Sequence, residues 1–468
     1  MLFNSIHFLW FLPVVLVLYY ALKHQYRWIL LFAASSYFYS AFYPPYLLIL
    51  YFIILVDYFA GLGMEKTEGT KRKAILMVSI VANVGLLSYF KYYNFFITSA
   101  NDIALALGSK PNFNAIKIIL PIGLSFHTFQ SLSYTIEVYW KRQKAEHHLG
   151  YFANYVLFFP QMVAGPIERY ASLGNQLHIK QVFNYDNIAN GLRLILYGLF
   201  VKMCVADNMA TIAEQLYANP GKVTTASTWI GLFAFSIQIY AYFYGYSTIA
   251  IGAGRCMGIK MMDNFRQPYF ASGVQNFWQR WHISLSTWFR DYVFIPLGGS
   301  RVKTGRWMLN ILAVFALSGL WHGANYTFII WGLAHATLYF IEYFLHKTPL
   351  LAVTKTTAGR WVGSIITFIA VTLVWVFFRA VDIKQVGEVF KTAFGSLAGA
   401  DVTIEPTIWQ LMPLGVFIIF EILIAGKRFE QWAGSFAMPV RWATYAVLAF
   451  CIILLSGIQS YPFIYFQF

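Results

Sequence analysis

Apolar segments of nearly membrane-spanning length recur along most of the chain, and they constrain its fold more than any other feature. A helix needs about 20 mostly apolar residues to cross the hydrocarbon core of a bilayer, and roughly twelve segments come near that length. They lie near residues 2–20, 28–43, 46–60, 74–93, 116–138, 190–206, 228–251, 307–325, 326–345, 361–378, 408–425 and 442–459. The sequence therefore predicts an all-α polytopic membrane protein with about 11–12 transmembrane helices.

The composition agrees with a membrane protein and excludes several other classes. Of the 468 residues, 59% are hydrophobic and 11% are charged, whereas an ordinary globular domain has about 25% charged residues. That balance excludes a soluble enzyme and a disordered chain. Cys204, Cys256 and Cys451 are isolated in apolar surroundings, so neither a disulfide framework nor a redox motif is predicted. The first apolar segment has no basic region before it, which favours a retained helix over a signal peptide.

Basic residues gather in alternate loops between the predicted spans. Lys and Arg number 34 against 19 Asp and Glu, an excess that in a soluble protein would suggest nucleic-acid binding. The basic loops contain Lys23, Lys66, Lys141, Arg255, Lys347 and Lys427, whereas the turn at Pro44 and the loop 94–115 have almost no charge. Because cytoplasmic loops are enriched in Lys and Arg, both termini are predicted to lie outside. The lipid bilayer, and not nucleic acid, then explains the net charge.

Two apolar stretches fit neither a membrane span nor a solvated loop. Residues 151–167 are interrupted by Pro160, Gly165 and Pro166, and residues 277–296 mix aromatic side chains with charged ones. Irregular backbone at membrane depth is tolerated only where protein or a water-filled cavity satisfies its polar groups. We therefore predict re-entrant or interfacial helices around a central funnel that opens to the cytoplasm. No linker or convincing internal repeat divides the sequence, so the chain is predicted to form one domain.

His322 is the clearest candidate for a catalytic residue. It lies in an apolar stretch, LSGLWHGANYTFIIWGLAH at residues 317–335, and an ionisable residue inside a span by default marks a functional site. A glycine follows it, and Trp321 and Asn325 flank it, so the backbone can open and a polar group can approach the imidazole. A neutral histidine can act as a general base. The alternative is a structural, hydrogen-bonded histidine, which is the favoured interpretation of His335.

His282 is a second candidate, within the stretch QRWHISLSTWFRDY. This stretch is too polar to face lipid. It fits either an interfacial anchor, with Trp and Arg at headgroup level, or a wall of a reaction chamber. In the second interpretation His282 is a polar partner in the active site, and Arg280 and Arg290 meet an anionic acyl donor. If the stretch forms a helix, Arg280 and Asp291 lie at its opposite ends.

Other motifs carry less information. The sequence GAGRCMG at residues 252–258 has the wrong spacing for a dinucleotide-binding loop and fits close helix packing. His147 and His148 have no Cys or carboxylate at ligand spacing, so no metal site is predicted. The tail YPFIYFQF at residues 461–468 is unusually aromatic. It predicts docking in an outer funnel or on a partner, or else an aromatic belt at the outer interface.

Several of these motifs resemble those of the bacterial membrane-bound O-acyltransferases that serve exported polymers. The stretch QPYFASGVQNFWQRWHISLSTWFRDYVFIPLGGSR at residues 267–301 is similar to the signature segment of that family, and residues 317–335 are similar to the segment with its catalytic histidine. FNSIHFLWFLPVVLVLYY near the amino terminus and VAGPIERY at residues 163–170 also resemble it. The likeness covers nearly the whole chain. It implies that His322 is the catalytic histidine and His282 a second active-site position.

The resemblance is closest to the polysaccharide O-acetyltransferases that act on alginate or peptidoglycan. It implies an enzyme of the bacterial inner membrane that takes an acetyl group from cytoplasmic acetyl-CoA, without a further cofactor. The acetyl group would pass to an extracytoplasmic SGNH-type partner that acetylates the polymer. Arg280 and Arg290 would contact the phosphates of the donor, and Trp321 and Asn325 would lie beside the substrate. The tail matches an FxYFxF ending of that group, which implies that Tyr465 accepts the acetyl group as a relay.

The main alternative is a polytopic transporter or channel, whose spans also contain polar residues near the midplane. Composition does not separate the two classes. The sequence has no obvious paired halves with matching broken helices, and no chain of intramembrane carboxylates suited to ion coupling. A catalytically silent scaffold for a secretion complex is a third interpretation. Neither alternative accounts for both histidine segments together with the tail.

Overall fold

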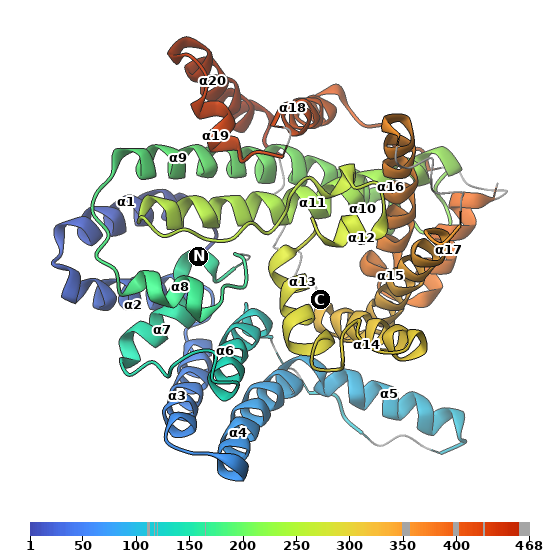
Figure 1. The fold of residues 1–468 in the computed structure, drawn as a ribbon. Coiled ribbons are helices and arrows are strands. Elements are labelled where there is room, and N and C mark those ends of the chain that lie inside the picture. Colours follow the sequence, from blue (N-terminus) through green and yellow to red (C-terminus); the bar gives the residue numbers. More distant parts are fainter. Residues whose placement is uncertain are drawn as a thin grey trace. The chain divides into compact units, whose positions relative to one another are not determined.

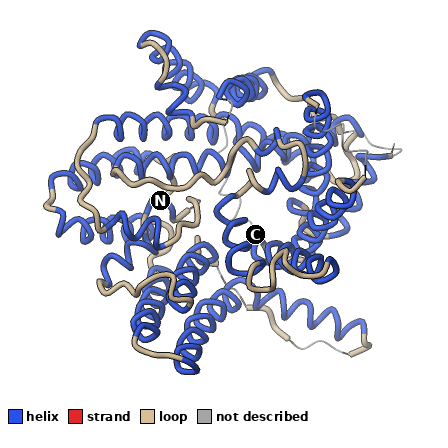
Figure 2. The backbone as a smooth tube through the Cα atoms, viewed as in Figure 1, coloured by secondary structure: helices blue, strands red, loops and turns tan. Residues whose placement is uncertain are grey.

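The computed structural model describes residues 1–109, 113–116, 118, 120–163, 165–348, 356–395, 402–424 and 426–457. These residues form helices joined by turns and loops, and the described part contains no β-strand (Figure 2). An isolated β-bridge pairs Val223 with Val402. The predicted all-α fold is therefore confirmed. By its internal contacts the chain forms two compact units, unit 1 with residues 1–189 and 253–262 and unit 2 with residues 190–252 and 263–468.

The described residues of unit 1 form eight helices, α1 to α8, and two irregular turns. The helices are α1 (Ile6–Ala21), α2 (His24–Ser40), α3 (Tyr46–Glu65), α4 (Gly69–Leu87), α5 (Tyr93–Ala106), α6 (Leu124–Tyr139), α7 (Leu149–Leu157) and α8 (Tyr170–Leu177), with the π-helical turn η1 (Ser88–Tyr92) after α4 and the 3-10 turn η2 (Phe159–Gln161) after α7. The helices α3, α4 and α6 pack against one another and lie side by side in Figure 1.

A buried carboxylate joins these three packed helices. Asp57 on α3 accepts hydrogen bonds from Ser79 on α4 (2.6 Å), from Asn83 on α4 (2.9 and 3.0 Å) and from Ser131 on α6. All four side chains are buried. Buried polar groups are tolerated when donors satisfy them, so Asp57 fixes the mutual position of the three helices.

Unit 2 contains the longest helix and the segments with the candidate histidines. Its elements, two of which extend beyond the unit, are α9 (Tyr185–Phe200), η3 (Val201–Ala206), α10 (Asp207–Ala218), α11 (Thr225–Cys256), η4 (Pro268–Phe270), α12 (Val274–Trp278), α13 (Ile283–Phe289), η5 (Arg290–Phe294), α14 (Thr304–His322), α15 (Tyr326–Leu345), α16 (Thr357–Arg379), α17 (Ile383–Phe394), α18 (Ile408–Ile424), α19 (Phe429–Gly434) and α20 (Met438–Leu455). A Cβ atom on Gly252 would lie 2.6 Å from the carbonyl oxygen of Gly191. This glycine of the GAGRCMG sequence thus serves close helix packing.

The helices α14 and α15 also approach through glycines. A Cβ atom on Gly319 would lie 2.2 Å from the carbonyl oxygen of Phe328, and one on Gly332 would lie 2.1 Å from that of Phe315. Both distances are far below van der Waals contact, so only glycine lets the two backbones come this close. α14 ends at His322, and the short connection to α15 holds that residue at the helix end.

Six described helical segments have the length and apolar composition to cross a membrane. They are Tyr46–Glu65, Gly69–Ala106, Tyr185–Ala218, Tyr326–Leu345, Thr357–Arg379 and Met438–Leu455, while Ile6–Ala21 and Ile408–Ile424 are apolar but shorter. The long helix α11, predicted as a span at 228–251, is not among the six. Its sequence includes four tyrosines, which lower its hydropathy. The segments agree with a multi-pass membrane protein.

Some predicted boundaries differ from the observed helices. The span predicted at 74–93 continues through η1 into α5, so the outer loop predicted at 94–115 contains a helix. The span predicted at 116–138 is helical only from Leu124 onward. Hydropathy marks apolar stretches, and it does not mark where backbone hydrogen bonds begin and end.

Both stretches predicted to be re-entrant or interfacial are broken into short helices. α7 ends at Leu157, and the 3-10 turn η2, with Pro160 inside it, follows. The prediction of one continuous helix around His282 is wrong, because α12 ends at Trp278 and α13 begins only at Ile283. His282 itself has a left-handed backbone conformation, with φ +43°, and this interrupts the helix.

Candidate functional site

His322, the last residue of α14, lies in an aromatic cluster of unit 2. Its side chain is buried. The ring centroids of Trp321, Trp331 on α15 and Phe378 on α16 lie 4.9, 5.0 and 5.2 Å from that of the imidazole. These three aromatic side chains shield the imidazole from bulk water. Because α14 stops at this residue, the imidazole lies where the helix backbone opens.

His282 precedes α13 in an uncommon backbone conformation, with φ +43° and ψ +53°. A residue other than glycine keeps such a conformation only when its surroundings hold it. Asn264 supplies these contacts. Its carbonyl oxygen accepts from the backbone N–H of Ile283 (2.9 Å), and its Oδ1 accepts from the hydroxyl (2.9 Å) and the backbone N–H (3.3 Å) of Ser284. Asn264 in turn donates from Nδ2 to the hydroxyl of Ser247 on α11 (3.0 Å).

The structure brings the two candidate histidines together. The ring centroids of His282 and His322 lie 6.5 Å apart, with 66° between the ring planes. His282, which lies outside the candidate spans, is only 3% exposed, and burial lowers its pKa to about 3. Its imidazole is therefore neutral at physiological pH. At this separation both rings can contact one small substrate group.

His335 on α15 has a different environment. The ring of Phe277 lies parallel to it with centroids 6.2 Å apart, and the rings of Trp278 and Trp331 meet it edge-on at 5.0 Å. Neither ring nitrogen of His335 has a hydrogen-bond partner among the described residues. Aromatic packing, rather than the hydrogen bonds of an ordinary buried histidine, surrounds this side chain.

The two residues that flank His322, the candidate catalytic histidine, have different surroundings. Trp321 lies beside both histidines, with its ring centroid 6.3 Å from that of His282. Asn325 caps α15, because its side chain accepts from the backbone N–H of Thr327 (3.1 Å), and it donates to the carbonyl oxygen of Val381 (2.7 Å). The amide of Asn325 therefore serves the local fold.

Arg290 and Arg280, the two arginines predicted to contact the acyl donor, differ in exposure and in their contacts. Arg290 is exposed, and its Nε lies 2.8 Å from the carboxylate of Asp291, so its charge already has a counterion. Arg280 lies in the break between α12 and α13, where its carbonyl oxygen accepts from the backbone N–H of Arg266 (3.0 Å). The side chain of Arg280 is half-buried.

Two further predictions concern the tail and metals. Tyr465 and the whole tail 461–468 lie outside the described residues. Within the described ranges, no group of three or more His, Cys, Asp or Glu side chains is arranged to hold a metal ion.

Comparison with known proteins relates this chain to acyl-transferring membrane proteins. Residues 37–381 match the model of the membrane-bound O-acyltransferase family, MBOAT, which covers more than half of the chain. A probable alginate O-acetylase, AlgI, of Pseudomonas aeruginosa is 40% identical over 400 residues, which is 84% of this chain and 75% of the relative. The AlgI of Azotobacter vinelandii is 39% identical over 398 residues, covering 84% and 78%. The peptidoglycan O-acetyltransferase of Helicobacter pylori is 35% identical over 432 residues, covering 84% and 80%.

Proposed function

Because this chain belongs to the membrane-bound O-acyltransferase family and is an O-acyltransferase in a membrane, we propose that it moves an acetyl group from cytoplasmic acetyl-CoA toward an exported polysaccharide. The names of the similar alginate and peptidoglycan O-acetyltransferases support acetyl as the transferred group. They also support a polysaccharide of the alginate or peptidoglycan type as the final acceptor. The site of action is the bacterial inner membrane, with both termini outside, as the alternation of basic loops suggests.

The observation that carries this proposal is the pair of buried histidines with ring centroids 6.5 Å apart. A general base must come within hydrogen-bond reach of the proton that it takes. His322 is the base, because its ring lies where α14 ends and the backbone opens, while aromatic side chains keep water away. His282 is the second polar contact, held in position by its unusual backbone.

The reaction is a transfer from a thioester to an oxygen. The imidazole of His322 takes the proton from an acceptor hydroxyl as that oxygen attacks the carbonyl carbon of acetyl-CoA. The bond between carbon and sulfur breaks, and the departing thiolate of CoA takes up the proton. The products are an oxygen ester and free CoA, and the imidazole is neutral again.

The first acceptor is the phenol of Tyr465 in the aromatic tail. A tyrosine has an ordinary pKa of about 10, so it is more easily activated than a sugar hydroxyl, and its ester keeps the potential for a second transfer. Eight extended residues reach about 26 Å at 3.3 Å each, a large part of the roughly 30 Å hydrocarbon core. An extracytoplasmic SGNH-type partner then takes the acetyl group from the tail and places it on the polymer.

The test is transfer of labelled acetyl from acetyl-CoA to the polymer by purified protein together with its SGNH-type partner. His322→Ala should lower the rate by about 10² to 10⁴, the usual cost of losing a general base, without lowering yield or membrane insertion. His346→Ala is the matched control, because that histidine is exposed at the end of α15 and should leave the rate unchanged. Full activity of correctly folded His322→Ala would overturn the proposal and favour a transporter.

A further inference from the structure

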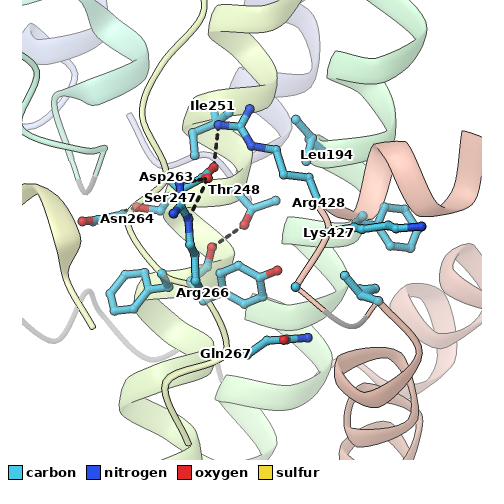
Figure 3. Close-up of a pocket in the computed structure, with 15 residues that line it drawn as sticks. Leu194, Ser247, Thr248, Ile251, Asp263, Asn264, Arg266, Gln267, Lys427 and Arg428 are labelled. Atoms are coloured by element: carbon cyan, nitrogen blue, oxygen red, sulfur yellow. Dashed lines mark hydrogen bonds and ion pairs between the residues drawn. The ribbon is translucent and has the colours of Figure 1, made fainter. Parts of the chain in front are cut away.

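A cavity lined by cationic side chains lies in unit 2, beside the turn that holds His282 (Figure 3). Its walls include Arg266 from the segment before α12, and Lys427 and Arg428 from the segment before α19. These two segments are far apart in the sequence. Both belong to basic stretches that the charge pattern assigns to the cytoplasm.

Cationic side chains outnumber anionic ones in the lining of this cavity. The carboxylate of Asp263 pairs with both arginines, with its oxygens 3.0 Å from Nη2 of Arg266 and 2.5 Å from Nη2 of Arg428. Lys427 is exposed at the rim. Among the residues that line the cavity, three cations face one carboxylate, and Asp263 contacts both guanidinium groups. Arginines oriented in this way favour phosphate, whose oxygens accept their paired hydrogen bonds.

The size of the cavity agrees with a phosphate group. Its volume is about 60 Å³, whereas a single buried water needs roughly 10–15 Å³. The cavity therefore has room for several waters or for one tetrahedral anion. It is too small for a whole nucleotide, so most of a larger ligand would lie outside it.

The cavity borders the candidate catalytic site. Asn264 and Phe265 line it. Asn264 also bonds to the residues that follow His282, and the ring centroid of Phe265 lies 6.0 Å from that of His282. A ligand anchored here by one phosphate would thus have its remaining atoms near the histidines.

From this arrangement we propose that Arg266, Lys427 and Arg428 bind a phosphate group of the acyl donor. This inference rests on the proposed function, since it identifies where a CoA thioester is held. The flexible pantetheine arm lies between the phosphates and the thioester, and in this proposal it leads from the cavity toward the two histidines. Arg290 pairs one to one with Asp291, whereas in the cavity lining three cations share the single carboxylate of Asp263.

The same chemistry could come from the phosphate of an anionic lipid headgroup, and the experiment separates the two sources. Full-length protein is placed in nanodiscs of zwitterionic lipid, and binding of acetyl-CoA is measured by equilibrium dialysis. Acetyl-pantetheine, which has the thioester but no phosphate, is measured in parallel. Both measurements are repeated in nanodiscs that contain anionic lipid.

The cavity variants should weaken binding of acetyl-CoA only. Lys427→Ala should raise its Kd about two- to fivefold, as expected for an exposed ion pair, and Arg428→Ala about tenfold, as expected for a partly buried one. Lys427→Arg should restore the wild-type Kd. The Kd of acetyl-pantetheine should be the same for wild type and all variants. Arg360→Ala removes an exposed cation at the start of α16, outside the cavity lining, and is the matched control without effect.

Three results would overturn the inference. The first is an unchanged Kd for acetyl-CoA in Arg428→Ala, and the second is an equal rise in the Kd of acetyl-CoA and of acetyl-pantetheine. The third is a variant whose Kd for acetyl-CoA equals that of wild type in zwitterionic nanodiscs and differs from it only in nanodiscs with anionic lipid. The last result would assign the cavity to a headgroup. Binding requires no turnover, so the proposed function is tested separately. Wild-type protein that binds acetyl-CoA through the cavity but transfers nothing would overturn the function and leave the phosphate site intact.

Discussion

At the scale of single residues, the most consequential contact is the one between Asn264 and the turn at His282. A left-handed backbone at a residue with a side chain costs of order 1–3 kcal/mol, and the hydrogen bonds of Asn264 to Ile283 and Ser284 offset that cost. Asn264 bonds to the two residues that follow His282 and to Ser247 on α11. It is therefore a positioning residue, which acts on the reaction through the direction of the imidazole of His282.

We expect Asn264→Ala to lower kcat about 10- to 100-fold with little change in KM, because a displacement of about 1 Å at a reacting group can cost that much. Asn264→Asp keeps the Oδ1 acceptor for Ser284 and should recover part of the lost kcat. Initial rates of acetyl transfer over a range of acetyl-CoA concentrations give both constants. A purely structural role would instead show as lower thermal stability and yield, with normal kcat in the folded fraction.

Some residues of the candidate site can be predicted from the sequence, and others cannot. His322 and His282 were identified because each is an ionisable residue in unusual surroundings, and because their segments resemble a known family. Asn264 gave no such signal, since its partner Ser247 is 17 residues away and only the fold brings them together. Asp57 is different, because the rule that selected His322 also applies to a carboxylate inside an apolar segment. The same rule therefore selects Asp57 on α3 from the sequence alone.

At the scale of elements, the hairpin of α14 and α15 sets the position of His322. Gly319 and Gly332 let the two helices touch backbone to backbone, and α14 ends three residues after the first of these glycines. Any increase in the helix separation therefore moves the imidazole. Hydropathy indicated both helices, but it contained no information about how closely they approach.

Gly332→Ala should destabilise the folded protein by about 1–3 kcal/mol, since its Cβ would lie 2.1 Å from the carbonyl oxygen of Phe315 and overpacking costs this much. Gly305→Ala is the matched control, because no atom lies within 4 Å of the position of its Cβ. That substitution should stabilise α14, by up to about 1 kcal/mol. Thermal unfolding in detergent measures both. Equal melting temperatures for the two variants would contradict the importance of the close approach.

At the scale of the whole molecule, the predicted orientation can be checked against the dimensions of one helix. α4 has 19 residues, which gives a length of about 28 Å at 1.5 Å per residue, close to the roughly 30 Å of the hydrocarbon core. The helix direction changes at η1, where α5 turns away from α4 (Figure 1). A single crossing by α4 thus separates its basic start from α5, as the charge pattern predicts. Which helices pack together could not be predicted, because side-chain contacts between distant segments decide it.

Single cysteines in a variant without the three native ones test this orientation. Lys71→Cys should be protected from an impermeant thiol reagent in intact cells, and Asp102→Cys should react, because the first lies at the basic start of α4 and the second on α5. Both positions are exposed, so burial does not prevent labelling. Arg72 is unsuitable, since its guanidinium is buried against the carbonyl oxygens of α6. Labelling of Lys71→Cys from outside would reverse the assigned topology.

The carboxylate of Asp57 has a consequence for the order in which the chain enters the membrane. An Asp at the centre of an isolated helix opposes insertion by about 2.5–3.5 kcal/mol, and its donors Ser79, Asn83 and Ser131 belong to helices that are synthesised later. During biogenesis α3 therefore lacks the partners that its carboxylate has in the finished protein. It gains Ser79 and Asn83 with α4 and Ser131 only with α6. We therefore expect α3, α4 and α6 to enter the bilayer together, with α3 held at the insertion machinery until α4 and α6 have been synthesised.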